Sequence, residues 1–308
     1  MIIRDNPHSL RLFFIIRGSV LPLVYLRIIF ITLLGAGVAL VQHFYPATFP
    51  SFTLAPVALF GVALSLFLGF RNNASYDRWW EGRKQWGKLI VASRSLSRKM
   101  VSYVDGTQKQ GAEMQRYVIN LIIAFSHALR HQLRSTDPWP DITSYIAQND
   151  VQFLRDAQSL TDGILRLIGA KLGECRRQNL ISDFLMLKMD EHMTAMADVQ
   201  ASCERIQNTP LPFAYMLLVQ RTAYLYCFIL PFAIVASQGL VTPLFSAIIA
   251  YTFFGLDALS EELEEPFGVS ANDLPLHAMS RTIEINLLDI LGEKTLPNPI
   301  QAHNHRLE

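Results

Sequence analysis

Charged residues are scarce in this 308-residue chain: they make up 17% of it, against roughly a quarter in ordinary soluble proteins. Hydrophobic residues make up 51%, and the mean hydropathy is +0.23. A formal net charge of +1 provides no basic excess for binding nucleic acid. An apolar excess of this size should be concentrated in membrane spans. The composition therefore predicts an integral membrane protein whose surroundings are the lipid bilayer.

Cysteine and catalytic motifs are also sparse. The three cysteines are Cys175, Cys203 and Cys227, scattered without a C-x-x-C pair, which argues against a disulfide framework or a thiolate metal site. The chain lacks a phosphate-binding G-x-x-x-x-G-K-[ST] loop, a G-x-S-x-G nucleophile motif and a dinucleotide fingerprint. We therefore expect no enzymatic activity.

Four uncharged stretches fit spans of about 20 residues: 28–41, 52–70, 222–237 and 240–256. The first extends back through Leu21 if Arg27 snorkels or faces protein. Between them, apolar residues recur at helical spacing, as at Val118, Leu121, Ile122, Phe125 and Leu129. The prediction is an all-α protein with four transmembrane helices and a helical cytoplasmic domain. Its parts are an N-terminal segment 1–27, spans one and two 28–70, the middle domain 71–221, spans three and four 222–256, and a C-terminal segment 257–308.

Basic residues flank only one side of these spans. Four precede the first span and five follow the second, namely Arg4, Arg11, Arg17 and Arg27, then Arg71, Arg78, Arg83, Lys84 and Lys88. The short connectors 42–51 and 237–243 contain no lysine or arginine. By the positive-inside rule, both termini and the middle domain are cytoplasmic.

Two parallel stripes run along the second span. Val62, Leu66 and Phe70 are bulky and apolar at successive i+4 positions, while Gly61, Ser65 and Gly69 form a line of small residues, and the two lines lie side by side. Periodicity alone favours ordinary helix packing, in which the small line lets neighbouring helices approach closely.

Three blocks of sequence resemble the bacterial branch of the bestrophin family. The first is FLGFRNNASYDRWW at 67–80, followed by QWG at 85–87. The second is PFAY at 212–215, continuing to QRT at 220–222, and the third is EELEEPFG at 261–268 with ANDLPL at 271–276. The blocks stand in family order and extend over nearly the whole chain.

This resemblance implies an ion channel in the bacterial inner membrane. The family assembles as a homopentamer whose second spans surround a central pore, so the chain's partners would be its own copies and monovalent ions. By position, Val62, Leu66 and Phe70 would form the apolar neck. A narrow apolar constriction can gate by expelling water.

A second constriction is implied at the cytoplasmic end, where Phe184 is the candidate aperture residue. The alternative is that Phe184 is a core residue of an amphipathic helix with Ile181 and Leu185. Asp183 beside it would place five carboxylates in a ring, which favours cations. We therefore expect sodium or potassium selectivity, with a chloride or other anion channel, as in eukaryotic bestrophins, as the alternative.

Acidic residues at the end of the fourth span match, by position, a cluster that binds calcium in vertebrate bestrophins: Glu261, Glu262, Glu264 and Glu265. Calcium needs six to eight oxygen ligands, and Leu263 interrupts the run. We favour ion pairs with the basic segment after the second span over a calcium site, and we expect no other cofactor. His127 and His131 have a spacing that can hold a metal, but a solvated or interfacial helix face is the favoured interpretation.

Two other classes of protein remain open at this point. A membrane sensor or scaffold would use the four spans only as an anchor for a partner-binding cytoplasmic domain. A secondary transporter would need a charged or broken-helix site at mid-membrane, where Pro231 is the main helix breaker.

Overall fold

The computed structural model describes residues 1–3, 15–16, 18–46, 48–50 and 53–308. Arg4, Arg11, Arg17 and Phe52, on which parts of the predicted orientation and second span depend, lie outside these residues. Two compact units form, one from residues 4–79 with 210–266 and the other from residues 1–3, 80–209 and 267–308. These units reflect packing, whereas the predicted division at residues 27, 70, 221 and 256 follows hydropathy and stays a prediction.

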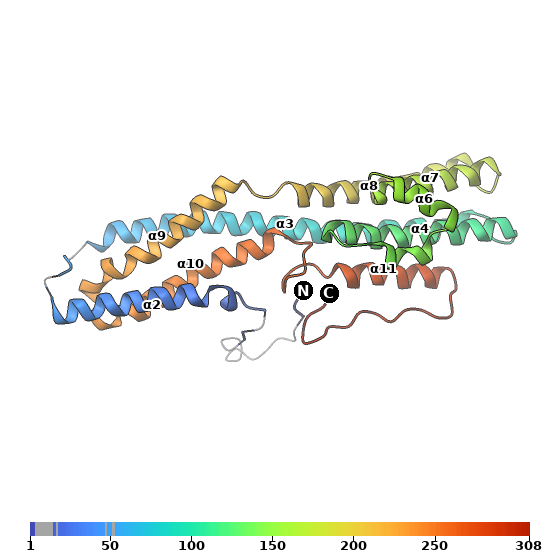
Figure 1. Cartoon of the computed structure of the whole chain (residues 1–308). Coiled ribbons are helices and arrows are strands. Elements are labelled where there is room, and N and C mark those ends of the chain that lie inside the picture. Colours follow the sequence, from blue (N-terminus) through green and yellow to red (C-terminus); the bar gives the residue numbers. More distant parts are fainter. Residues whose placement is uncertain (4–14, 17, 47, 51–52) are drawn as a thin grey trace. The chain divides into compact units, whose positions relative to one another are not determined.

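The first unit, which we call the apolar unit, consists of long helices (Figure 1). They are α2 (Leu21–Phe44), the first half of α3 (Leu54–Tyr103), α9 (Phe213–Gln238) and α10 (Thr242–Glu264), with the 3₁₀ turn η2 (Gly239–Val241) between the last two. Prolines stand in the first turns of α2 and α10, where no intrahelical N–H bond is lost. Pro231 is inside α9.

Three helical stretches of the described chain are long and apolar enough to cross a membrane: Leu21–Phe44, Leu54–Tyr103 and Phe213–Glu264. The third stretch contains two α-helices, α9 and α10. Its division into two spans, and hence the total of four, stays a prediction.

The core of the apolar unit is built from all four of its helices. Helices α2, α9 and α10 pack side by side (Figure 1). Their buried residues form one cluster with two leucines of α3: Val24, Ile31, Leu64, Leu68, Val219, Ala223, Tyr226, Cys227, Leu230, Ala250, Phe253, Phe254 and Ala258. Two of the aromatic rings, Tyr226 and Phe253, meet edge to face at 5.2 Å between centroids.

The second unit, which we call the polar unit, is also helical. Besides the second half of α3, it contains α4 (Lys109–Arg134), α5 (Trp139–Ile142), η1 (Thr143–Tyr145), α6 (Gln148–Asp156), α7 (Leu160–Arg177), α8 (Asp183–Asn208) and α11 (Leu276–Ile290). Helix α4 is central because it packs against both α7 and α11. All five of its predicted periodic residues are fully buried. The described chain has isolated bridges but no named strand, so the all-α prediction is confirmed.

The solvated or interfacial face predicted around His127 is an interfacial one, buried against other helices of the polar unit. His127 is buried, its Nε2 lies 2.9 Å from Glu284 Oε2, and its ring stacks on Tyr145. The Tyr145 hydroxyl donates to the other Glu284 oxygen at 2.8 Å. Burial alone would raise the pKa of the Glu284 carboxyl, but the hydrogen bonds from His127 and Tyr145 outweigh it and lower that pKa. Helix α11 supplies the carboxylate, which the spacing within α4 could not reveal.

Candidate functional site: an outward apolar face on helix α3 and its polar clasp

Helix α3 has two opposite faces within the apolar unit. Leu64 and Leu68 are buried, at 2% and 0% exposure, in the core shared with α2, α9 and α10. Val62, Leu66 and Phe70 are 59%, 58% and 61% exposed. Side chains two positions apart on a helix point to nearly opposite sides, because successive residues are rotated by about 100° around the helix axis. The predicted neck residues therefore share the face that points away from their own chain's core.

The three small residues beside this face have different surroundings. A Cβ placed on Gly61 would overlap the Tyr226 hydroxyl of α9 and come within 2.9 Å of its ring carbon Cζ. A Cβ on Gly69 meets nothing within 4 Å, and Ser65 is exposed, its hydroxyl donating to the carbonyl of Val62. Only Gly61 is thus needed for packing within the chain, and Ser65 and Gly69 stay open.

A polar clasp fixes α3 directly after the apolar face, and we define it as Arg71, Asn72, Tyr215, Gln220 and Asp257. Arg71 forms a buried ion pair with Asp257 of α10, the two side chains being 4% and 1% exposed. The amide of Gln220, from α9, donates to the second Asp257 oxygen at 3.3 Å. A buried ion pair tolerates desolvation only when its remaining polar atoms are also hydrogen-bonded, and Gln220 supplies one such bond.

The other two members of the clasp bind backbone. The Asn72 amide donates to the carbonyls of Leu68, at 3.0 Å, and of Leu256, at 3.2 Å. The Tyr215 hydroxyl donates to the carbonyl of Phe67 at 3.2 Å. Helices α9 and α10 are therefore both attached to α3 within residues 67–72, the stretch that contains Phe70. This attachment fixes the rotation of α3 and hence the direction of its apolar face.

The acidic stretch at the end of α10 serves a structural purpose at Glu264. This residue is 6% exposed, its carboxylate accepts a 3.1 Å hydrogen bond from the Leu211 N–H, and its carbonyl accepts one from Arg78 Nε at 3.0 Å. Burial lowers the pKa of Arg78, and the charges of Glu264 and Glu265 partly offset it. Within the described residues, no three histidine, cysteine or acidic side chains form a group that could hold a metal ion.

The predicted aperture residues are in the polar unit, at the start of α8. Phe184 is 83% exposed, so it is not a core residue of the chain, whereas Ile181 is buried. Asp183 accepts a 2.5 Å hydrogen bond from Arg176 Nε, and this bond lowers the pKa of the Asp183 carboxyl. Since the arginine neutralises the carboxylate locally, the five-carboxylate ring expected from the sequence would be much weaker as a source of cation preference.

The sequence reasoning missed the Arg71–Asp257 pair. Arg71 was counted only toward orientation, and Asp257 only marked the end of an apolar stretch. One signal could have found it: each is the first charged residue after an uncharged run, following Phe70 and Leu256 respectively. Opposite charges at the same ends of two adjacent spans lie at a similar depth and can pair.

The comparisons with known proteins agree with this architecture. The family model described as Bacterial/Fungal Bestrophin protein matches residues 1–289. A voltage-dependent anion channel-forming protein of Mesorhizobium japonicum is 43% identical, over 96% of this chain and 95% of its own. One of the same description from Escherichia coli K12 is 41% identical over 99% of both. A crystal structure of a bacterial bestrophin homolog from Klebsiella pneumoniae is 39% identical with a TM-score of 0.82, covering 88% of this chain and 100% of that one.

These matches, together with the long apolar helices, identify an ion-channel protein of the membrane and not an enzyme. The chain belongs to the bacterial/fungal bestrophin family.

Proposed function

We propose that five copies of this chain form a channel in the bacterial inner membrane and that Val62, Leu66 and Phe70 of each copy surround its pore. The supporting observation is the orientation of α3: these three side chains are exposed while Leu64 and Leu68 on the opposite face are buried. Other apolar residues of this unit are exposed as well, as expected for contact with lipid. The neck face differs because open small residues, Ser65 and Gly69, adjoin it and leave room for a neighbouring α3.

The neck would gate by dewetting. Rings of valine, leucine and phenylalanine side chains offer water no hydrogen bonds, so a narrow passage between them empties and an ion cannot cross until it widens. The polar clasp is positioned to hold the neck in one rotation. Phe184, exposed on α8, is the proposed second constriction.

We propose that the permeant ions are anions, contrary to the cation preference expected from the sequence. Two relatives with more than 40% identity are described as voltage-dependent anion channel-forming proteins. The neck contains no acidic side chain, and Arg176 pairs with Asp183.

The proposed topology has four spans, with α9 and α10 crossing the membrane separately, and both termini in the cytoplasm. The basic residues beside the first two spans support this orientation.

Planar-bilayer recording of the purified chain tests conduction and selectivity together. We expect unitary currents whose reversal potential, in a potassium chloride gradient, lies toward the chloride equilibrium potential. A reversal potential near that of potassium would restore the cation alternative. Absence of currents from both the wild type and a Leu66→Ala neck variant would favour the sensor or scaffold. The companion measurement is the mass of the solubilised complex, expected to be five times 34.9 kDa.

Two substitutions separate the contribution of the aperture charges. Arg176→Gln removes the partner of Asp183 and leaves five free carboxylates, so the reversal potential should move toward the cation value. Asp183→Asn leaves Arg176 without its partner, which adds unpaired positive charge, so the reversal potential should move further toward the chloride value. A shift in the same direction in both variants, or no shift in either, would contradict the contribution of this ion pair.

A further inference from the structure

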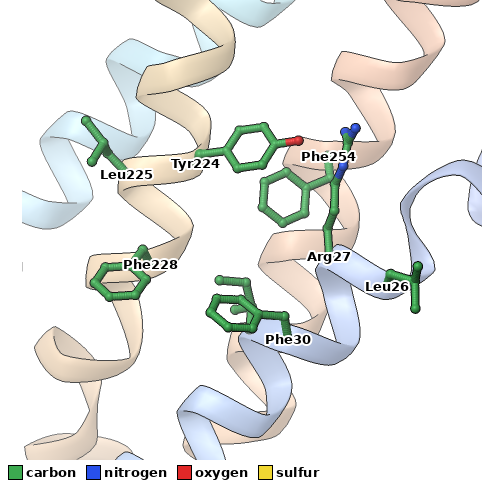
Figure 2. Close-up of a pocket in the computed structure, with 8 residues that line it drawn as sticks. Leu26, Arg27, Phe30, Tyr224, Leu225, Phe228 and Phe254 are labelled. Carbon is green, nitrogen blue, oxygen red and sulfur yellow. The ribbon is translucent and has the colours of Figure 1, made fainter.

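A cavity of about 520 Å³ opens between α2 and α9 in the apolar unit (Figure 2). Cavities that bind small molecules range from roughly 300 to 1,000 Å³. Figure 2 shows Phe30 and Phe228 facing each other from the two helices, with Arg27 and Tyr224 together at one end. Arg27 and Tyr224 each come one helical turn before an apolar lining residue, Ile31 and Phe228 respectively. The cavity therefore has one polar end, and the rest of its lining is apolar.

The floor of this cavity is covered by its own chain and the walls are not. Ile31 and Phe254 at the floor are 3% and 1% exposed, whereas Leu26, Phe30 and Leu225 on the walls are 66%, 58% and 59% exposed. Large apolar side chains on facing walls require an apolar occupant between them. A hydrocarbon chain lying lengthwise in the cavity would provide it.

Arg27 adds a charge to one end of the apolar cavity. Its guanidinium lies 5.4 Å from the centroid of the Tyr224 ring, and among the described residues it forms no ion pair or hydrogen bond. A guanidinium has five N–H donors, which suit a phosphate well. Arg27 is in the second turn of α2, about 9 Å along the helix at 1.5 Å per residue, a depth at which a long side chain reaches the headgroup region.

We propose that this cavity binds an anionic phospholipid, with the phosphate on Arg27 and the Tyr224 hydroxyl and one acyl chain between Phe30 and Phe228. Charge complementarity selects this occupant: an uncharged hydrocarbon would not use Arg27, and a soluble anion would not use the apolar walls. On the orientation proposed above, in which α2 begins on the cytoplasmic side, the lipid belongs to the inner leaflet, where anionic headgroups attract basic residues. This site does not require the chain to conduct ions.

The test uses the full-length chain in detergent and titrates it with phosphatidylglycerol, phosphatidylcholine or inorganic phosphate. Retained lipid is counted by mass spectrometry of the intact complex, and thermal stabilisation is measured in parallel. The variants are Arg27→Gln, the charge-conserving Arg27→Lys, and Leu225→Trp, which fills the cavity. Arg221→Gln, which removes an exposed arginine at the start of the apolar stretch of α9, is the matched charge control.

The wild type should retain phosphatidylglycerol at least tenfold more tightly than Arg27→Gln, and Leu225→Trp should lose the lipid as well. Arg221→Gln should bind like the wild type, and Arg27→Lys should bind more tightly than Arg27→Gln but less tightly than the wild type, because an ammonium keeps the charge and lacks the guanidinium fork. Equal binding of phosphatidylglycerol by Arg27→Gln, equal stabilisation by phosphatidylcholine, or equal stabilisation by inorganic phosphate would each overturn the proposal. Dissociation of the complex by Arg27→Gln and Leu225→Trp, with unchanged lipid binding, would show that a second copy of the chain fills the cavity instead.

Discussion

The two units of this chain bury polar groups for different reasons. In the polar unit, His127 of α4, Tyr145 of η1 and Glu284 of α11 form a hydrogen-bonded cluster within the core of the unit. In the apolar unit, the buried pair Arg71–Asp257 is at the end of a stretch of α3, residues 54–70, that contains no other charge. The polar unit thus has its buried polar contacts within an ordinary hydrophobic core. The apolar unit has its buried ion pair at the place where α10 holds α3.

The apolar unit also exposes large apolar side chains beside buried ones. Leu66 and Phe70 of the apolar unit are more than half exposed while neighbouring leucines are buried. Burying apolar groups away from water normally stabilises a fold, so such a surface implies that lipid, other copies, or a narrow pore covers it. The following substitutions test whether the units differ as described.

The largest effect is expected from Asp257→Asn, which leaves Arg71 buried without its counter-charge. Breaking one side of a buried pair costs about 3–5 kcal/mol, so the variant should unfold at a clearly lower temperature in detergent. The double variant Arg71→Met with Asp257→Leu should recover most of this loss, because apolar replacement of both partners is often neutral. A single variant as stable as the wild type would show that the clasp does not hold α3.

A comparison of Leu64→Ala with Leu66→Ala tests the two faces of α3. Leu64 is 2% exposed in the core, and truncating a buried leucine costs about 2–5 kcal/mol. Leu66→Ala should leave the thermal unfolding of the complex almost unchanged and increase its current by widening the neck. The opposite pattern, with Leu66→Ala destabilising more, would reverse the assignment of the faces.

Gly61→Ala should destabilise the apolar unit by about 1–3 kcal/mol, the usual effect of overpacking. The added methyl group meets the Tyr226 ring, which cannot easily move because it packs against Phe253. Gly37→Ala in α2 is the matched control, since its methyl group meets nothing within 4 Å in the chain. Combining Gly61→Ala with Tyr226→Phe should restore part of the stability. A double variant no more stable than Gly61→Ala would contradict the close approach of α3 and α9 at Gly61.

The smallest effect, about 1 kcal/mol, is expected from Glu284→Gln in the polar unit, because glutamine keeps one acceptor oxygen and replaces the other with an NH₂ donor. The folded-state pKa of Glu284 is lowered, so its contribution is present above the unfolded value of about 4.3 and is lost as the pH falls through the folded value. Wild type and variant should therefore differ at pH 7 and converge in thermal unfolding as the pH falls below the folded-state pKa of Glu284. A stability difference between wild type and Glu284→Gln that grows on acidification would contradict a charged Glu284 in this cluster.

Much of the fold follows from local patterns in the sequence. The uncharged stretches and the helical spacing of residues such as Val118 and Phe125 predict long apolar helices and a helical second unit, because both patterns reflect which side chains a helix can bury. The stripe of Val62, Leu66 and Phe70 also follows from spacing, and the structure adds that it points away from the core.

Long-range partners could not be obtained in that way. Asp257 is far from Arg71 in the sequence, and Glu284 is far from His127, so no periodic pattern links them. For this reason the sequence left a solvated and an interfacial face open for His127, and the structure shows that helix α11 covers it. The cation preference likewise depended on a free Asp183, and the local pairing with Arg176 weakened it.

The most direct test of the central claim, that one face of α3 lines a water-filled pore, is cysteine accessibility during recording. The three native cysteines are buried, and burial raises the pKa of Cys203 to about 12. We therefore expect no reaction of the native cysteines with a thiol reagent. A charged methanethiosulfonate reagent should alter the current of Leu66→Cys and leave Leu68→Cys unaffected. A current that the reagent alters in Leu68→Cys but not in Leu66→Cys would contradict the account.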